Sequence, residues 1–548
     1  MKRFAFVATV LLIAGLVLTG CGGAQPAPQA TAAPSGGAQP APTAAPSGAS
    51  AQSKQLVIAM DVDVVDMDPA RAFSDTYLII GKAMYDQLTE LDPKDPTKIN
   101  PQLAEKWEIS PDGKVYTFQL RKGVKFPSGN ELTSEDVKFS LERLQNLKSN
   151  PGFLMDGVEK VEAPDPTTVR FTLTAPDASF LPRTSAVYMA ILDSKEAKAH
   201  GCTNAADAEK TDKGKEWLDD HSLGSGPFIL ERWERNSEIR LKANPNYWRG
   251  KPGFETVVVK YVKDATTQSQ MLQRGDIDIA MNIDPDTGKQ LQGVAGVKLQ
   301  QGLSPSIIYL AMTTKKEVSP EVANQKVRQA VSLSIDYDGL CNQVLAGAAV
   351  TPPSVIPNGF LGADSVPGLK RDVAKAKALL AEAGYPNGVK ITAHYANLTM
   401  FGVDFNVVMQ KLQADLKEAG ITLELVPQEM SVFLEGYRGG KDAFVIGWQT
   451  PDFYDSHANA WALGASDGVF CKRMAYVNPE NDKLVADAVK TTDPEARKAL
   501  YAKLLKNIQN DANFLSLIQP KENVAYRDNI KGFEYHPVVK VDIPKLSK

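Results

Sequence analysis

The segment 447–457 (GWQTPDFYDSH) concentrates the side chains best suited to binding chemistry. Its two carboxylates, Asp452 and Asp455, can pair with a positively charged ligand group, which needs such a partner when it is buried. The apolar run 443–446 before them is typical of a buried strand, so we expect both aspartates on a loop at the end of that strand. There they could either bind a ligand or only cap the loop. Aromatic side chains that could stack on sugar rings cluster in the same stretch: Trp448, Phe453, Tyr454 and Trp461.

The histidines and hydroxyl residues do not form the pattern of an enzyme. The five histidines are scattered, and no HExxH, GxSxG, P-loop or strand–helix GxGxxG pattern occurs. His457 could serve a metal complex, but a lone histidine beside an aspartate loop is more often a hydrogen-bonding support. We therefore expect neither catalysis nor a cofactor, and the cysteine spacing predicts no structural zinc site.

The N-terminal residues predict export from the cytoplasm. Lys2 and Arg3 precede the apolar run 4–18, which is shorter than the ~20 residues of a membrane span and typical of a secretory signal. Residues 18–21 (LTGC) resemble a lipobox, in which the chain is cut before the cysteine and the thiol is acylated. We expect residues 1–20 to be a signal peptide and Cys21 to anchor the chain to the cell membrane, in the periplasm or on the outer face. An ordinary signal peptide with an incidental cysteine is the alternative.

The stretch after the cysteine predicts a tether. Residues 22–53 carry no charge and consist almost entirely of Gly, Ala, Pro, Gln, Ser and Thr. Such a composition cannot bury enough apolar surface to order itself. About 30 residues would reach roughly 30 Å as a coil and nearer 100 Å as extended polyproline.

The rest of the chain has the composition of a soluble globular protein. With 43% hydrophobic and 23% charged residues in 548, the sequence can build a large core, and its length favours two or more lobes. The formal net charge of −4, without a basic tract, argues against nucleic-acid binding. Three cysteines remain after Cys21. We expect a disulfide between Cys341 and Cys471, which leaves Cys202 as a free thiol.

Strand and helix patterns occur together, which indicates an α/β or α+β fold. Strands are expected where apolar residues alternate or run together, at 56–58, 116–120, 169–173, 257–259, 421–425 and 444–446. Helices are expected after a possible capping box at Thr133 and Asp136, after Asp372 and over 404–419, the last two ending at Gly384 and Gly420.

Several blocks in order resemble the peptide-binding family of ABC-importer solute-binding proteins, the receptors for dipeptides and oligopeptides. The resemblance covers nearly everything from residue 56 to about 538. The blocks are PQLAEKW (101–107), PDGK (111–114), FQLRKGVKF (118–126), LTSEDV (132–137), GSGPF (224–228), NPNYW (244–248), GDID (275–278), VRQA (327–330) and AKALLAEAGYPNG (376–388).

The resemblance implies an α/β fold of two lobes that close on ligand like a flytrap, with an extra subdomain in lobe I. It places lobe I at 54–301, lobe II at 302–517 and a C-terminal return to lobe I at 518–548. The resemblance also implies a monomer that captures peptides and delivers them to a membrane permease complex. It implies no enzymatic activity on the peptides. The alternative ligands are an oligosaccharide, a nickel chelate, a haem or an opine. The alternative roles for the same fold are those of an adhesin or a chemoreceptor.

The resemblance also assigns the ligand site. The family's segment of Gly-Trp and an acidic loop maps onto Trp448 and Asp452, where the aspartate binds the peptide ammonium. One extra residue after Trp448 leaves Asp455 as a competitor. Phe73 and Ser74 are expected to meet ligand in lobe I, and Tyr309 lies on a segment that either lines the cleft or belongs to a core strand. Dipeptide receptors hold the ligand carboxylate with an arginine near the start of the helix at 404–419, but residues 396–413 contain no arginine, which favours a longer peptide or another ligand.

Overall fold

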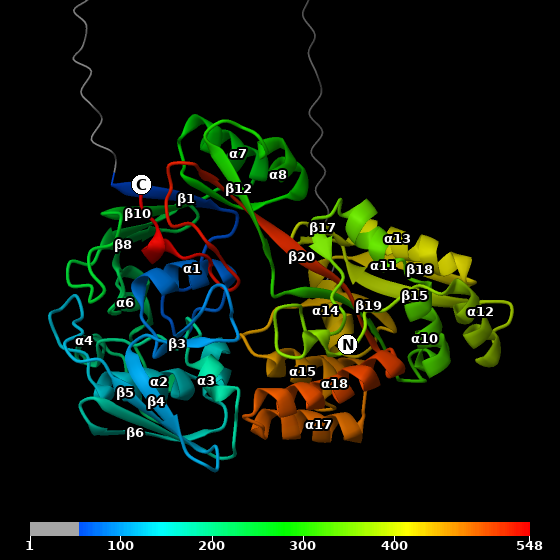
Figure 1. The fold of residues 1–548 in the computed structure, drawn as a ribbon, viewed down its shortest axis with the longest axis horizontal. Helices are drawn as coiled ribbons and strands as arrows, with labels where there is room; N and C mark the ends of the chain where they lie inside the picture. The colour runs from blue at the N-terminus through cyan, green and yellow to red at the C-terminus, as the bar shows by residue number, and fades with distance from the viewer. Residues whose placement is uncertain (1–53) are drawn as a thin grey trace, which may run out of the picture. The chain divides into compact units, whose positions relative to one another are not determined.

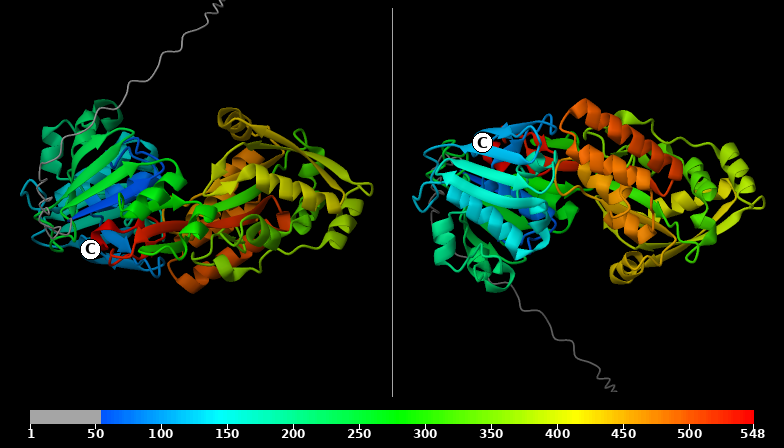
Figure 2. Two further views of the ribbon diagram at one scale, coloured as in Figure 1. Left: turned by 90° about the horizontal axis from the view of Figure 1, so that it is seen from above. Right: turned by 90° about the horizontal axis from the view of Figure 1, so that it is seen from below.

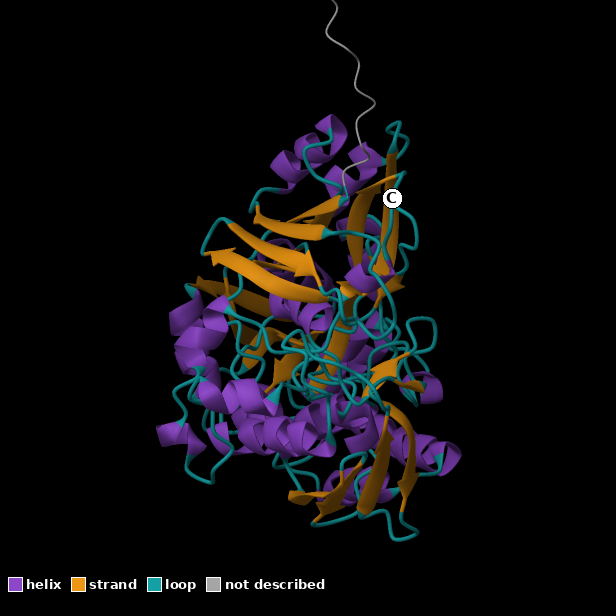
Figure 3. Ribbon diagram, turned by 90° about the vertical axis from the view of Figure 1, so that its left-hand side faces the viewer, coloured by secondary structure: helices purple, strands orange, loops and turns teal. Residues whose placement is uncertain are grey.

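The computed structural model describes residues 54–548, so the predicted signal peptide, Cys21 and the tether lie outside the described residues. Helices and strands are mixed throughout this part of the chain (Figure 3), which confirms the predicted α/β class. None of the helices in residues 54–548 is long and apolar enough to cross a membrane.

One long strand, β20 (Phe514–Arg527), runs through the centre of the fold (Figure 1). Within the described chain it belongs to a mixed sheet of 12 strands. Its first residues pair antiparallel with β13 (Ile307–Met312), and its last residues pair antiparallel with β11 (Ile279–Ile283) and β12 (Val297–Leu303). At about 3.3 Å per residue, 14 residues extend over about 46 Å, so β20 connects two separate parts of the sheet.

The two halves of the sheet lie on either side of β20, as the left view of Figure 2 shows. One half continues from β11 to β1 (Gln55–Met60), β10 (Thr256–Tyr261), β9 (Glu238–Ala243) and β8 (Phe228–Glu234). The other continues from β13 to β19 (Phe444–Gln449), β15 (Val389–Ala396) and β18 (Ile421–Gln428). The short β14 (Ala349–Val350) pairs with the middle of β20.

A separate sheet of four antiparallel strands occupies the first half of the chain. Its order is β4 (Ala104–Ile109), β5 (Val115–Leu120), β7 (Thr168–Leu173) and β6 (Val158–Asp165). Tyr116, Phe118 and Leu120 are buried at alternate positions, as their spacing predicts. Helix α2 (Ser134–Leu147) contacts β6 and β7 and begins with the predicted capping box of Thr133 and Asp136.

The helices of the second half also begin and end where the sequence predicts. Asp372 caps α12 (Val373–Glu382), and Asp404 caps α13 (Phe405–Glu418). Gly384 and Gly420 follow them with φ of +94° and +90°, a conformation that glycine adopts without strain. Other helices that matter below are α1 (Asp75–Met84), α7 (Ala265–Arg274), α14 (Met430–Arg438), α15 (Ser456–Gly464), α16 (Val469–Met474), α17 (Pro479–Lys490) and α18 (Pro494–Asp511).

The buried apolar residues form separate clusters on the two sides of β20. The largest cluster takes residues from 56–281 and 524–546, and two others take residues from 307–518. The predicted lobe boundaries near 301 and 517 fall close to the changes between these clusters. We call the cluster from 56–281 and 524–546 the first core region and the two clusters from 307–518 the second core region. The proposal below treats the two regions as lobes.

The three cysteines of the described chain are free and buried. Cys202, Cys341 and Cys471 each belong to a different core cluster. The predicted disulfide between Cys341 and Cys471 is therefore wrong, because each thiol packs among apolar side chains of its own cluster. Burial raises the pKa of all three thiols, that of Cys202 to about 12.

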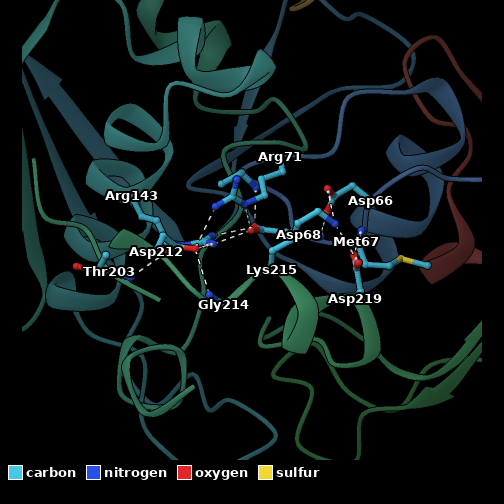
Figure 4. A network of polar contacts seen from close by, with 11 residues as sticks. Asp66, Met67, Asp68, Arg71, Arg143, Thr203, Asp212, Gly214, Lys215 and Asp219 are labelled. Atoms are coloured by element: carbon cyan, nitrogen blue, oxygen red, sulfur yellow. Dashed lines mark hydrogen bonds and ion pairs between the residues drawn. The ribbon is translucent and has the colours of Figure 1, made fainter. Parts of the chain in front are cut away.

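A buried ion-pair network joins α2 to the loops around it (Figure 4). The Arg143 guanidinium, 1% exposed, donates to both oxygens of Asp68 at 2.8 and 2.6 Å and to both oxygens of Asp212 at 2.8 and 3.0 Å. Arg71 lies 3.3 Å from Asp68 and 3.2 Å from Asp212. Two guanidinium groups therefore compensate two carboxylates, and both carboxylates and Arg143 are buried.

We predict that Arg143→Ala lowers the free energy of unfolding by about 3 kcal/mol. The change leaves two buried carboxylates with Arg71 as their remaining cation, and breaking a buried pair typically costs about 3–5 kcal/mol. Equilibrium unfolding in urea measures the loss. Arg274→Ala, which removes an exposed pair with Asp276, is the control and is expected to change stability little. Equal stability of the two variants would contradict the assigned role of the network.

Candidate functional site

The acidic loop follows β19 and ends at α15. The strand stops at Gln449, and residues 450–455 have no regular hydrogen-bonded structure. Pro451 lacks a backbone N–H and cannot continue a sheet ladder. Thr450 Oγ1 lies 2.8 Å from Ser306 Oγ, which fixes the start of the loop to the segment before β13. The strand and this contact place Asp452 at the edge of the second core region.

A cavity of about 180 Å³ lies beside this loop, and we call it the Asp452 cavity. Its walls come from both core regions, from the segment before β13, and from β20 with the C-terminal hairpin. They include Phe73, Ser74, Leu78, Leu91, Pro182 and 185–188 from the first core region, 304–306, 450–454, Glu522, Pro537, Val538 and Lys540. A ligand in this cavity therefore touches both core regions at once.

Asp452 is the carboxylate of this cavity without a partner. No hydrogen bond or ion pair to its side chain occurs among residues 54–548. Asp452 is exposed at the mouth of the cavity, and the protein atoms around its carboxylate displace only part of the bulk water. This desolvation raises the pKa of Asp452 to about 6. The site thus holds a negative charge that a ligand cation would stabilise.

Asp455, the predicted competitor, is engaged within the protein. Its two oxygens accept hydrogen bonds from Arg497 of α18 at 2.7 and 2.6 Å, and Oδ1 also accepts from the backbone N–H of His457 at the start of α15. Asp455 is buried, and the carboxylate raises the pKa of Arg497 further above its ordinary value. These contacts favour the loop-capping role for Asp455 and leave Asp452 as the carboxylate of the loop without a partner among the described residues.

Phe73 and Ser74 line the Asp452 cavity from the first core region. The Phe73 ring is 42% exposed and lies 5.3 Å from the Tyr188 ring and 6.1 Å from the Phe153 ring, measured between centroids. Ser74 caps α1 and accepts from the backbone N–H of Tyr77 at 3.3 Å. Phe73 therefore offers apolar surface to a ligand, while the Ser74 side chain is already occupied by its helix.

Trp448 and Tyr309 lie on neighbouring strands in a second hollow of about 450 Å³. Trp448 is partly buried against Phe405, with ring centroids 6.0 Å apart. Tyr309 is fully buried, and its hydroxyl lies 2.8 Å from that of Tyr437. Tyr309 is therefore a buried residue of a core strand, like Ile308 and Leu310, and its side chain also borders this hollow.

Glu522 and Lys540 line the Asp452 cavity and were not expected from the sequence. They form an ion pair of 3.0 Å, and Tyr535 donates to Glu522 at 3.3 Å. Their side chains are 9% and 13% exposed. The two adjacent charged residues at 521–522, inside a strand whose first and last thirds are mostly apolar, were the available signal. The partner Lys540 is 18 residues away, and no local pattern indicates it.

The metal alternative gains no support from the described residues. Within residues 54–548 no group of three or more His, Cys, Asp or Glu side chains could hold a metal ion. His457 lies with Asp452 in a third hollow, which opens between α15 and residues 174–183. Burial lowers the pKa of His457 and favours its neutral form.

Comparison with known proteins places this geometry in a family. Residues 98–470 match the family described as bacterial extracellular solute-binding proteins, family 5. The chain is 30% identical to the dipeptide-binding protein of Escherichia coli over 91% of its length and 95% of that protein. It is 29% identical to the probable D,D-dipeptide-binding periplasmic protein of the same organism, over 90% of this chain and 93% of the other.

A solved structure has the same fold at comparable identity. The periplasmic binding protein DppA of Helicobacter pylori, in complex with the peptide STSA, superposes with a TM-score of 0.72 and is 27% identical, over 90% of this chain and 98% of the other. The predicted periplasmic-binding-protein-like fold is thereby confirmed.

We predict that Asp452→Asn stabilises the ligand-free protein at pH 7.5 by up to about 1 kcal/mol. The folded-state pKa of about 6 lies above the ordinary value near 3.9, so the charged form opposes folding above pH 6 and this cost disappears below about pH 4. Solvent exposure of the side chain keeps the gain small. Melting temperatures at pH 7.5 and pH 4 measure it, with Asp276→Asn as control. A variant that is less stable than wild type at pH 7.5 would contradict the electrostatic description.

Proposed function

Because the chain belongs to family 5 of the bacterial extracellular solute-binding proteins, which bind solutes for ABC importers and are not enzymes, we propose that its solute is a short peptide. Asp452 carries this proposal: it is an unpartnered carboxylate in a cavity with walls from both core regions. A peptide always supplies an ammonium group, and its side chains vary. Pairing with the ammonium therefore allows binding with little dependence on sequence.

Capture follows from the position of the cavity between the two core regions. A ligand that contacts Phe73 on one side and Asp452 on the other stabilises the arrangement in which both are close to it. Opening and closing of the regions as lobes would let the solute enter and would then enclose it. The closed form would be the one recognised by the permease complex in the membrane.

The site of action is extracytoplasmic, as for the periplasmic relatives. We propose that Cys21 carries the lipid anchor and that residues 22–53 act as the tether, which would keep the binding domain within reach of the permease. Multiple acyl chains would hold the protein stably, since a single chain gives only marginal anchoring. The protein would act as a monomer and would need no cofactor.

An oligosaccharide is the second candidate ligand, based on the aromatic residues near the loop. Two of the four are engaged within the protein. The Tyr454 ring stacks on Phe360 at 3.9 Å with an interplanar angle of 17°, and Trp461 donates to Asp467 at 3.1 Å. The Phe453 and Trp448 rings remain partly exposed, and Trp461 is 39% exposed. A ligand cation for Asp452 favours the peptide over the neutral sugar.

We predict that Asp452→Ala weakens peptide binding by about 2–5 kcal/mol, because it removes one partner of a desolvated ion pair. The chain from residue 22 onward is unfolded and refolded to remove carried ligand, and then tested by calorimetry against pools of random peptides, oligosaccharides and metal chelates. N-terminal acetylation of the peptides is expected to cause a similar loss in wild type and none in the variant. Asp276→Ala serves as the matched control.

Two results of this experiment would contradict the proposal. A loss below about 0.5 kcal/mol in Asp452→Ala would exclude Asp452 as the ammonium partner. Binding of oligosaccharides alone would retain the family and replace the solute.

We also predict that peptide affinity falls about tenfold between pH 7 and pH 5. With a pKa of about 6, Asp452 is roughly nine-tenths ionised at pH 7 and one-tenth ionised at pH 5. A peptide ammonium stays protonated in this range, so the carboxylate sets the dependence. Calorimetry at both pH values measures the change, and Asp452→Asn is expected to show none between them. A stronger affinity at pH 5 than at pH 7 would contradict the assignment.

A further inference from the structure

The two core regions also meet at the end of α17, where a backbone hydrogen bond joins them. The N–H of Ala178, in the loop before α3 (Phe180–Arg183), donates to the carbonyl oxygen of Val489 at 2.6 Å. Val489 lies in the last turn of α17, where the carbonyls of a helix have no partner within the helix. The first core region thus supplies a donor to one of these carbonyls, and neither Ala178 nor Val489 lines the Asp452 cavity.

The loop that carries Ala178 is fixed by its own hydrogen bonds. The Asp177 carboxylate accepts from the backbone N–H of Ser179 at 2.8 Å and from the Ser179 hydroxyl at 2.6 Å. The backbone carbonyl of Asp177 accepts from the Tyr116 hydroxyl at 2.8 Å. It also accepts from the backbone N–H of Phe180 at 3.2 Å, which closes a four-residue turn. Ala178 is the second residue of this turn, so its N–H is held in position for α17.

Arg497 binds the neighbouring carbonyl of the same helix end. Its Nε donates to the carbonyl oxygen of Ala488 at 3.0 Å, and its terminal nitrogens donate to the two Asp455 oxygens at 2.7 and 2.6 Å. Arg497 is 6% exposed, and its guanidinium carbon lies 5.4 Å from the centroid of the Tyr501 ring. A planar guanidinium presents its donors in a rigid arrangement. The acidic loop and the end of α17 are therefore fixed relative to each other.

The acidic loop leaves little freedom between Asp455 and Asp452, which are three residues apart. The backbone N–H of Asp455 donates to the carbonyl oxygen of Phe453 at 2.8 Å. The Phe453 side chain packs against the first core region. On the other side of Asp452, the ring of Pro451 restricts the backbone. A displacement of Asp455 is therefore passed on to the Asp452 carboxylate.

We propose that Arg497 is a positioning residue for solute binding, which couples the contact at the end of α17 to the placement of Asp452. The inference rests on the proposed function, in which Asp452 binds the ammonium group of a peptide. Arg497 does not line the Asp452 cavity, so it acts on the solute through Asp455. When the core regions separate, the hydrogen bond of Ala178 is lost and the end of α17 can move with the acidic loop. Asp452 is then placed for an ammonium group only in the closed form.

The test changes each end of this chain of contacts separately. Ala178→Pro removes the N–H donor and suits the turn, because Ser179 has the φ of −80° and ψ of −11° of a type I turn, in which proline is favoured at the preceding position. Ala178→Ser keeps the N–H and is the matched control. Arg497→Lys keeps the charge without the planar fork. The double variant Asp455→Asn, Arg497→Gln, which replaces the buried ion pair by two amides, takes its place if the lysine variant does not fold.

The measured quantity is the ammonium preference, which is the affinity for peptides with a free N-terminus divided by that for the same peptides after acetylation. Calorimetry of the mature chain at pH 7 gives both affinities. We expect Ala178→Pro and Arg497→Lys each to lower the preference about fivefold or more, the usual size of a coupling between sites. The fall in affinity between pH 7 and pH 5 is expected to become smaller in both. Combining the two changes is expected to lower the preference no further, because they interrupt the same chain of contacts.

Three outcomes would overturn the inference and leave the proposed function intact. The first is an unchanged ammonium preference in either variant, including an equal loss for free and acetylated peptides, which indicates a purely structural role. The second is a loss in Ala178→Ser as large as that in Ala178→Pro. The third is multiplication of the two effects in the combined variant, as expected of independent sites. Absence of any ammonium preference in wild type would overturn the peptide proposal itself and this inference with it.

Discussion

The continuity of β20 is the constraint on which the rest of the structure depends. Its first residues belong to the ladder with β13, and its last belong to the ladders with β11 and β12, so both core regions are attached to one strand. Any change in the angle between the regions must be taken up between the two ladders, at 518–521 and in the adjacent 303–306. Pro520 lies in this interval and has no N–H to donate, but its carbonyl accepts from the backbone N–H of Ser304, and β14 pairs with Gln519 and Pro520, so the crossing is also held from both sides.

Several buried carboxylates of the described chain have cations as partners, and Asp452 does not. Asp68 and Asp212 share Arg143, Asp455 holds Arg497, and Glu522 holds Lys540. Each of these carboxylates is compensated inside the protein, as buried charges require. Asp452 differs from them because it is exposed at the cavity, has no cation among the described residues, and has a pKa raised by desolvation. A ligand cation bound there would lower that pKa.

The sequence was informative wherever the signal is local. Capping residues such as Asp372 and Asp404 mark helix starts because they bond to N–H groups two or three residues away, and alternation at 116–120 marks a strand with one buried face. The resemblance to a family identified the loop with Asp452. Long-range pairs were not visible: the partner of Asp455 is 42 residues away on α18, and it decides which of two aspartates is available. The predicted disulfide failed for the same reason, since spacing does not reveal that Cys341 and Cys471 pack in different clusters.

The sizes of the two hollows bear on the length of the solute. Ligand sites for small molecules typically enclose about 300–1,000 Å³, and the Asp452 cavity, at about 180 Å³, is smaller than that. A solute bound there must therefore extend beyond it or separate the two core regions. The hollow lined by Trp448, at about 450 Å³, adds space in the direction of β19, with largely apolar and aromatic walls. A solute with a positive group at one end and an extended body would fit both the space and the charge of Asp452, whereas a neutral solute would leave Asp452 without a cation.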